Sequence, residues 1–376
     1  MVPSPNGCAG STATRKPHDP RVSSLQERIM TPTAELRYEQ AETVAIEEIP
    51  IIDFAPFLHG GAADRARVAQ SIREACRRIG FFYIVNHGVP ESLRQAVLSE
   101  ARTFFARSRA AKMETAPLLD GQWCGYLPGR GAAEGTQPGG SLLPGATKAK
   151  VSGGSLEQFN MMRVRDADDV NYDARDPIYQ RNRWPADAPG FVETMIVNQR
   201  ALRSLGTSLM QAFALALGLD EGFFVGMHRS PLATFGLNFY PAPVAGQPSA
   251  DVGVGAHCDA SSFTVLLQDD VGGLEVRDSG GRWISAPHVP GAYVINIGDT
   301  MMGWTNGEFV STLHRVVSRK PVDRFSATMF MNPDREVVVR PIDRFVTKEN
   351  PARYEPFSND EYMRRFFGKF YDTMFK

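Results

Sequence analysis

The chain has few cysteines, no long apolar run and almost no net charge, and each shortage excludes a class of protein. Four cysteines in 376 residues are too sparse for a disulfide-stabilised scaffold, and no CxxC pair is present to build a structural zinc site. No apolar run approaches the roughly 20 residues that a transmembrane helix needs. The net charge of −1 gives no basic surplus for binding nucleic acid or an anionic membrane.

The N-terminus also lacks the apolar stretch of a secretory signal, so the sequence predicts a cytoplasmic protein. Residues 1–45 are rich in Ser, Thr, Pro, Gly and charge, and they predict a flexible N-terminal extension with a short helix near residues 23–30. The apolar share of 43% suits a globular core for the remainder.

Three regions follow the extension. Residues 46–190 predict a helix and strand region that contains a Gly-rich loop at 129–155, interpreted as a lid, a partner surface or disorder. Residues 191–346 begin with a long amphipathic helix and continue as short strands separated by turn signals, which is typical of a jelly roll. Residues 347–376 predict a helical tail that packs back on the barrel and borders the substrate entrance.

The expected fold class is therefore mixed α+β, with a double-stranded β-helix (jelly roll) core and flanking helices. Apolar spacing and end signals define the individual elements. Strands are expected at 49–54 and 81–86, and helices at 64–79, 90–107, 191–217 and 359–375.

An HxD pattern stands at the start of the β-rich half. His257 and Asp259 are two residues apart, so in an extended chain both side chains point to the same side. His314 follows in a second β-like run, and two imidazoles with one carboxylate form the facial triad that holds Fe(II) while leaving other positions open. A zinc hydrolase with the same ligands remains open, although the HExxH helix of many such enzymes is absent. An ordinary hydrogen-bonded histidine is the simpler interpretation of each residue alone.

Arg324 and Ser326 repeat this spacing shortly after the second histidine. A guanidinium offers a planar fork that matches a carboxylate, and a serine hydroxyl adds a third donor. The pair predicts an anion-binding position beside the metal, with a surface ion pair on an edge strand as the alternative.

Several motifs, in this order along the chain, resemble the isopenicillin N synthase-like branch of the 2-oxoglutarate- and Fe(II)-dependent dioxygenases. They are IPIIDF at 49–54, the stretch 76–89 ending in NHGV, LNFYP at 237–241, QDDVGGLEV at 268–276, NIGD at 296–299 and the segment 304–316. The resemblance covers about residues 49–370.

The resemblance implies a set of site residues and cofactors. His257, Asp259 and His314 would form the catalytic iron centre, and Arg324 and Ser326 would hold the distal carboxylate of the cosubstrate 2-oxoglutarate. Asn238 and Tyr240 occupy positions at which family members contact the cosubstrate, and O2 is the second cosubstrate. Three residues on or beside these strands are expected to contact the substrate: Phe263, Thr328 and Phe330.

By the same resemblance, the enzyme would hydroxylate, desaturate or cyclise a small organic molecule in specialised or amino-acid-derived metabolism, releasing succinate and CO2. A 2-oxoglutarate-independent oxidase, like isopenicillin N synthase or aminocyclopropane carboxylate oxidase, keeps the same arginine and serine. The synthase uses a late glutamine, and from Arg315 to Lys376 this chain has none, which favours the 2-oxoglutarate enzyme. A non-enzymatic jelly-roll sensor with a structural metal is the remaining alternative. No nucleic acid or membrane partner is expected, and the sequence specifies no oligomeric state.

Overall fold

The computed structural model describes residues 48–118, 122–129, 136–140, 148–152, 156–164, 181–242, 252–318 and 320–375. Residues Ala41–Lys376 form one compact unit. The flexible extension and short helix expected before residue 46 lie outside the described residues. None of the described helices is both long and apolar enough to cross a membrane.

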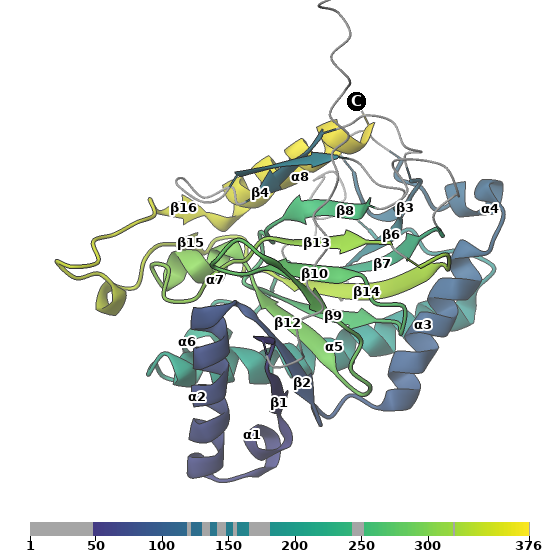
Figure 1. The fold of residues 1–376 in the computed structure, drawn as a ribbon. Coiled ribbons are helices and arrows are strands. Elements are labelled where there is room, and N and C mark those ends of the chain that lie inside the picture. The colour runs from purple at the N-terminus through teal and green to yellow at the C-terminus, as the bar shows by residue number, and fades with distance from the viewer. Residues whose placement is uncertain are drawn as a thin grey trace, which may run out of the picture. The chain divides into compact units, whose positions relative to one another are not determined.

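Two antiparallel-rich sheets form the core, which confirms the expected mixed α+β jelly-roll class (Figure 1). The larger sheet has eight strands in the order β1-β2-β12-β9-β14-β7-β6-β3, and only its first pair is parallel. Its strands are β1 (Ile51–Asp53), β2 (Phe81–Val85), β3 (Gly125–Leu127), β6 (Glu157–Met162), β7 (Thr234–Tyr240), β9 (Phe263–Gln268), β12 (Tyr293–Ile297) and β14 (Arg324–Met331).

The smaller sheet has four strands in the order β11-β10-β13-β8. These are β8 (Val252–His257), β10 (Leu274–Arg277), β11 (Trp283–Ala286) and β13 (His314–Val317). Two further pairs lie outside both sheets: β4 (Thr136–Gly140) with β5 (Lys148–Ser152), and β15 (Val338–Val339) with β16 (Phe357–Ser358).

Helices occur at the four ranges that the apolar spacing predicts, within a few residues at each end, and the described residues also contain four short helices that it does not predict. The helices are α1 (Ala55–His59), α2 (Ala62–Arg78), α3 (Glu91–Phe105), α4 (Arg109–Met113), α5 (Pro189–Ala216), α6 (Gly222–Val225), α7 (Asp299–Trp304) and α8 (Asn359–Phe375), with a 3-10 turn at Asp343–Phe345. Gly80 ends the α2 turn with φ +67°, and a Cβ there would lie 2.1 Å from the Val310 carbonyl oxygen. Only glycine fits this junction, which sets the start of β2.

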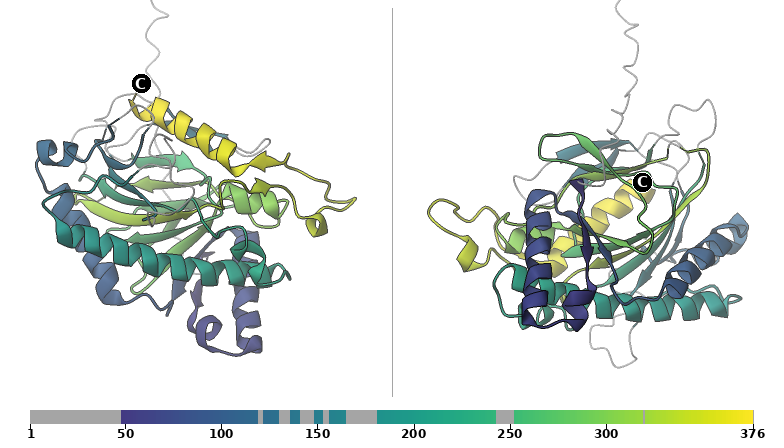
Figure 2. Two further views of the ribbon diagram at one scale, coloured as in Figure 1. Left: turned by 180° about the vertical axis from the view of Figure 1, so that it is seen from behind. Right: turned by 60° about the horizontal axis from the view of Figure 1, so that its bottom comes forward.

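Helix α5 covers one face of the eight-stranded sheet along its length (Figure 2, left). Its buried stripe includes Leu202, Leu205, Leu209 and Phe213, and it joins the main core cluster with side chains of β9 and β14. Gly206 permits the close approach, because a Cβ there would lie 2.7 Å from the Met331 methyl group. The other face of the sheet is thereby left for the barrel interior.

Two segments expected from composition take a different or more definite form. The Gly-rich stretch contains the antiparallel hairpin β4–β5, rather than being loop throughout, and both strands contact β8 while β4 also contacts α8. Backbone pairing has overridden the low strand propensity of glycine, as tertiary context often does. The tail forms α8 and packs on the barrel through Tyr362, Met363 and Phe367, as the sequence predicts.

Candidate active site

Three side chains that could bind a metal meet where the two sheets come together. His257 ends β8, Asp259 lies in the following turn, and His314 begins the neighbouring strand β13, where it is the direct register partner of His257. Each imidazole Nε2 lies 3.6 Å from Asp259 Oδ1, and the two rings have centroids 4.2 Å apart. The candidate ligand atoms all lie within 4.8 Å of one another.

The Nδ1 atom of each imidazole is hydrogen-bonded to a backbone carbonyl. His257 Nδ1 donates to the Gly255 carbonyl at 2.9 Å, and His314 Nδ1 donates to the Thr312 carbonyl at 3.0 Å. A carbonyl oxygen can only accept, so each Nδ1 carries the proton and each Nε2 keeps a lone pair. Both rings are thus fixed in the tautomer that a metal requires.

The two carboxylate oxygens of Asp259 also have separate roles. Oδ2 accepts hydrogen bonds from Thr264 Oγ1 and from Asn296 Nδ2, the latter at 2.7 Å, while Oδ1 faces the histidines. Asp259 is 4% exposed. The two donors therefore orient one carboxylate oxygen toward the metal position, as outer partners of metal ligands commonly do.

The protonation states favour a cation at this position. Burial, and then the adjacent His314, lower the pKa of His257 to about 4. Its side chain is 32% exposed, and His257 is among the residues that line the cavity. Burial raises the pKa of Asp259, but the neighbouring imidazoles and the Asn296 and Thr264 hydrogen bonds outweigh it, so its pKa lies below the usual value. Neutral imidazoles with one carboxylate fit Fe(II).

Arg324 and Ser326 lie on β14 and face the same cavity. Arg324 is 1% exposed, so it is not part of a surface ion pair. Its Nε donates to the Gly272 carbonyl at 2.6 Å, Nη1 donates to Ser326 Oγ at 3.4 Å, and the guanidinium lies 4.5 Å from the Tyr240 ring centroid. Nη2 has no hydrogen-bond partner among the residues described. A buried cation with a free donor is a site for an anionic ligand.

The adjacent strand β7 supplies the other two residues expected at the cosubstrate. In the register, Asn238 pairs with Ser326 and Tyr240 pairs with Arg324. Asn238 Nδ2 lies 3.4 Å from Ser326 Oγ, and both Asn238 and Tyr240 line the cavity. The structure thus brings the four residues of the expected cosubstrate site together.

Of the three residues expected to contact the substrate, two line the cavity and one does not. Thr328 and Phe330 continue the inward face of β14. Phe263 is fully buried on the opposite face, where its ring centroid lies 5.3 Å from that of Phe213 on α5. We therefore withdraw Phe263 as a substrate contact: the turn at residues 258–262 carries the chain from one sheet to the other, so the alternation of β8 does not continue into β9.

The cavity, counted with the open solvent at its mouth, has a volume of about 1630 Å³. One wall of the cavity is aromatic, and part of this wall comes from helix α8. Trp123 and Phe367 form this wall with ring centroids 4.7 Å apart, beside Met363 and Phe366. Such a cavity suits a small organic molecule with an apolar body.

Sequence reasoning missed Thr264, Asn296 and two residues of β6 that line the cavity, Gln158 and Asn160. A signal was present in β6, where Gln158 and Asn160 alternate with the apolar Phe159 and Met161. The roles of Thr264 and Asn296 depend on contacts between separate strands and have no local signal.

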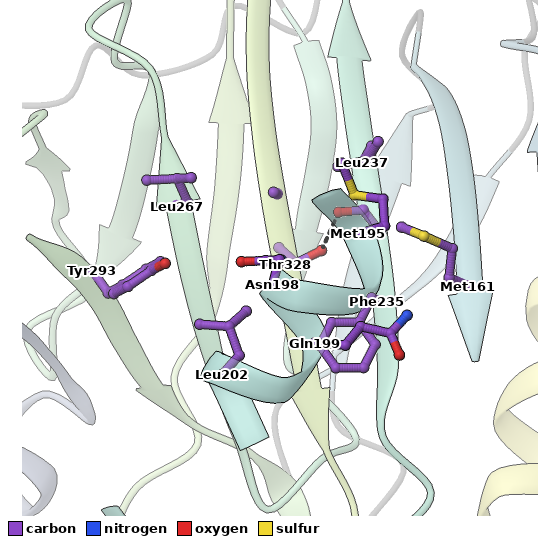
Figure 3. Close-up of a pocket in the computed structure, with 12 residues that line it drawn as sticks. Met161, Met195, Asn198, Gln199, Leu202, Phe235, Leu237, Leu267, Tyr293 and Thr328 are labelled. Atoms are coloured by element: carbon purple, nitrogen blue, oxygen red, sulfur yellow. Dashed lines mark hydrogen bonds between the residues drawn. The ribbon is translucent and has the colours of Figure 1, made fainter. Parts of the chain in front are cut away.

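A second, smaller cavity lies between α5 and the other face of the sheet (Figure 3). Met161, Asn198, Phe235 and Tyr293 are among the residues lining it, and the metal-binding candidates are not. The cavity beside His257 is therefore the candidate active site.

Two family models match the chain. The 2OG-Fe(II) oxygenase superfamily matches residues 233–333, and the non-haem dioxygenase in morphine synthesis N-terminal region matches residues 49–187. The first match contains the HxD pattern, His314, Arg324 and Ser326.

Curated relatives match over most of their length. The 2-oxoglutarate-Fe(II) type oxidoreductase hxnY of Emericella nidulans is 30% identical over 322 residues, which span 84% of this chain and 88% of the relative. Flavanone 3-dioxygenase 2 of Oryza sativa subsp. japonica is 30% identical over 338 residues, which span 87% of this chain and 85% of the relative.

A solved structure is also similar over most of its length. A full-length Neurospora crassa protein, crystallised in complex with alpha-KG and thymine, has a TM-score of 0.73 and 26% identity, covering 88% of this chain and 99% of that chain.

Proposed function

The chain belongs to the 2OG-Fe(II) oxygenase superfamily and is a 2-oxoglutarate- and Fe(II)-dependent dioxygenase. From this premise we propose which residues bind the iron, the cosubstrate and the substrate. His257, Asp259 and His314 hold the iron, Arg324 and Ser326 bind the distal carboxylate of 2-oxoglutarate, and Asn238 and Tyr240 line the cosubstrate. The substrate is a small organic molecule that lies beside Thr328 and Phe330.

One observation carries this proposal: the Nε2 atoms of His257 and His314 each lie 3.6 Å from Asp259 Oδ1. These three atoms share one cavity with the buried Arg324. Every other polar atom of these three ligands has a hydrogen-bond partner. The three free atoms are therefore directed at a common point, which is the arrangement of a two-histidine, one-carboxylate iron site.

The guanidinium of Arg324 supplies what the cosubstrate needs. Its free Nη2 and the Ser326 hydroxyl can donate to a carboxylate, and the contact of Nε with the Gly272 carbonyl fixes the plane of the fork. A charge-assisted pair with a buried guanidinium, here 1% exposed, is stronger than one at the surface. This anchor orients 2-oxoglutarate with its keto-acid end toward His257 and His314.

The bound iron would supply the redox chemistry that activates O2. The chain's own contribution is to orient the ligands through Thr264 and Asn296, to keep His257 neutral by burial, and to exclude water with Trp123 and the tail helix. The substrate is then oxidised by hydroxylation, desaturation or cyclisation, with release of succinate and CO2.

Similar proteins support a small-molecule substrate. One relative is named a flavanone 3-dioxygenase, and the Neurospora crassa structure contains thymine. We propose a role in specialised or amino-acid-derived metabolism for this chain, and a lid function for the β4–β5 hairpin, which contacts the strand that carries His257.

The test is succinate formation from 2-oxoglutarate with Fe(II), O2 and a substrate panel, under strict control of metal contamination. Asp259→Ala should reduce the rate at least about 1000-fold, because the site loses one of three ligands. Asp270→Ala, which removes an exposed carboxylate on the turn after β9, is the matched control and should keep the wild-type rate. Equal rates for the two variants would overturn the triad assignment.

The 2-oxoglutarate-independent oxidases make a different prediction for the same assay. Such an enzyme would oxidise its substrate without forming succinate. Substrate oxidation in equal amount to succinate therefore favours the proposed reaction over that alternative.

A further inference from the structure

The cavity contains a carboxamide that the proposed chemistry leaves without a role. Asn160 lies in the middle of β6 and is 2% exposed, and its side chain is on the cavity face of the eight-stranded sheet. Its Nδ2 has no hydrogen-bond partner among the residues that the structure describes. A buried donor without a partner costs about 1–3 kcal/mol, so the position calls for an acceptor that the folded chain does not provide.

A complementary acceptor stands two residues away on the same strand. Gln158 Nε2 donates to Asn238 Oδ1 at 3.0 Å, which directs its Oε1 elsewhere, and this buried oxygen has no partner in the described part of the chain. Alternate residues of a strand share a face, about 7 Å apart along it. The wall of β6 therefore presents a free donor and a free acceptor on the same face of the strand.

The neighbouring strand leaves room at this point. Asn160 pairs in register with Gly236 of β7, and Gly236 pairs with Thr328 of β14. A Cβ on Gly236 would lie 3.0 Å from Asn160 Oδ1 and 3.2 Å from Thr328 Oγ1. The glycine thus allows the carboxamide and the hydroxyl to approach each other across β7, on the side of the cavity away from Arg324.

The charges of the cavity disfavour a second anion. Among the described residues that line it, Arg324 is the only arginine or lysine, and the carboxylates of Asp259 and Asp299 face the same space. Asp299 Oδ2 already accepts a hydrogen bond from Tyr362 at 2.7 Å. Once 2-oxoglutarate pairs with Arg324, no cationic side chain remains in the described lining for another carboxylate, and burying an unpaired one would be costly.

From these contacts we propose that Asn160 and Gln158 determine substrate specificity by binding an uncharged group that carries an N–H beside a C=O, such as a lactam, imide or secondary amide, on a ring that packs against Trp123 and Phe367. Asn160 donates to the carbonyl oxygen and Gln158 accepts from the N–H. The inference rests on the proposed function, because it assigns Arg324 to the cosubstrate.

The test uses anaerobic calorimetry on the full chain loaded with Fe(II) and 2-oxoglutarate. Three bicyclic probes separate the features: quinolin-2(1H)-one has both groups, N-methylquinolin-2-one lacks the donor, and 2-naphthoate replaces them with a carboxylate. Quinolin-2(1H)-one should bind at least about tenfold more tightly than either of the others, as expected for one hydrogen bond in a buried site.

Asn160→Leu keeps the shape of the side chain and removes the donor to the carbonyl oxygen, so it should weaken the binding of quinolin-2(1H)-one at least about tenfold. The matched control is Asn198→Leu, which changes a buried carboxamide on α5 that borders the cavity behind the sheet (Figure 3). The control should keep the wild-type affinity for quinolin-2(1H)-one.

Three results would overturn the inference: no binding of quinolin-2(1H)-one, equal or tighter binding of either other probe, or an unchanged affinity for quinolin-2(1H)-one in Asn160→Leu. Titration of 2-oxoglutarate into the Fe(II)-loaded wild-type protein is measured first in the same instrument. Absence of that binding would be a failure of the proposed function, and it is distinguishable from a failure of the specificity assignment.

Discussion

The two faces of the eight-stranded sheet are built from the same strands but differ in the state of their polar groups. On β14, Phe325, Ala327 and Met329 face the helices and join the main core. Arg324, Ser326 and Thr328 alternate with them and face the cavity. The helix-facing side is mostly filled by core side chains, with the small cavity beside α5 as an exception, where Tyr293 Oη has no partner among the described residues. The cavity side retains a guanidinium nitrogen and a carboxamide nitrogen without partners among the described residues.

Buried histidine and glutamine side chains near the helix-facing side show the contrast. His228 binds the Phe224 carbonyl and Ser262 Oγ through its two ring nitrogens, and Gln199 binds backbone atoms of Met162 and Val164. These groups are satisfied within the fold, while Arg324 and Asn160 are not. Polar side chains on the helix-facing side therefore stabilise the fold, whereas those on the cavity face are available to bind a ligand. Each prediction below tests one of these two faces.

The largest expected effect is on the stability of the helix-facing side. Phe263→Ala should lower the free energy of unfolding by about 3–5 kcal/mol, because it empties a fully buried position against Phe213. Phe330→Ala, the same substitution on the cavity face, should cost much less, since that side chain is only partly buried. Chemical denaturation measures both, and equal losses would contradict the division into two faces.

Acid should lower the free energy of unfolding through His228, which lies near the helix-facing side. Burial lowers the pKa of His228 to about 4, so the unfolded chain, with an ordinary histidine pKa near 6.5, binds the proton first as pH falls. The stability is fully present above about pH 6.5 and is lost progressively down to pH 4, by about 3 kcal/mol. His228→Gln should flatten this part of the curve of unfolding free energy against pH. A slope unchanged by the substitution would show that His228 does not cause it.

On the cavity side, Arg324→Leu should raise the 2-oxoglutarate requirement about 100-fold, equivalent to about 2.7 kcal/mol, because the charge-assisted contact is lost. Arg324→Lys should recover part of the affinity, since an ammonium keeps the charge but not the fork. Steady-state kinetics with varied 2-oxoglutarate measures this, and Arg102→Leu on the helix-facing side is the control. A larger change in the substrate requirement than in the 2-oxoglutarate requirement would favour the 2-oxoglutarate-independent alternative.

The smallest expected effect concerns the outer partners of the metal ligands. Asn296→Leu removes one of two donors to Asp259 Oδ2 and should weaken Fe(II) binding about tenfold. Thr264→Val removes the other donor and should act similarly. Anaerobic Fe(II) titration gives the dissociation constants, and wild-type affinity in both variants would show that the carboxylate needs no such orientation.

The alternation of side chains made part of this site predictable. Within an unbroken strand, a two-residue period assigns Arg324, Ser326, Thr328 and Phe330 to one face, and the structure has them there. The rule does not extend from His257 and Asp259 to Phe263, because β8 and β9 belong to different sheets and the turn between them interrupts the alternation.

Other features depend on contacts between distant parts of the chain. The alternation of polar and apolar residues in β6 places Gln158 and Asn160 on one face, but only the pairing of β6 with β7 brings that face to the cavity. Asn296 meets Asp259 only because β12 pairs with β9, which begins shortly after the metal ligands. The hairpin in the Gly-rich stretch was also not predictable, because glycine lowers strand propensity unless tertiary contacts compensate.

The central claim is that one cavity holds both the iron and its cosubstrate, and anomalous diffraction at the iron edge tests it most directly. An anaerobic crystal with Fe(II) and 2-oxoglutarate should show one anomalous peak within bonding distance of His257 Nε2, His314 Nε2 and Asp259 Oδ1, with the distal carboxylate of 2-oxoglutarate on Arg324 and Ser326. A peak away from these three atoms, or a cosubstrate carboxylate bound elsewhere while Arg324 stays free, would contradict the account.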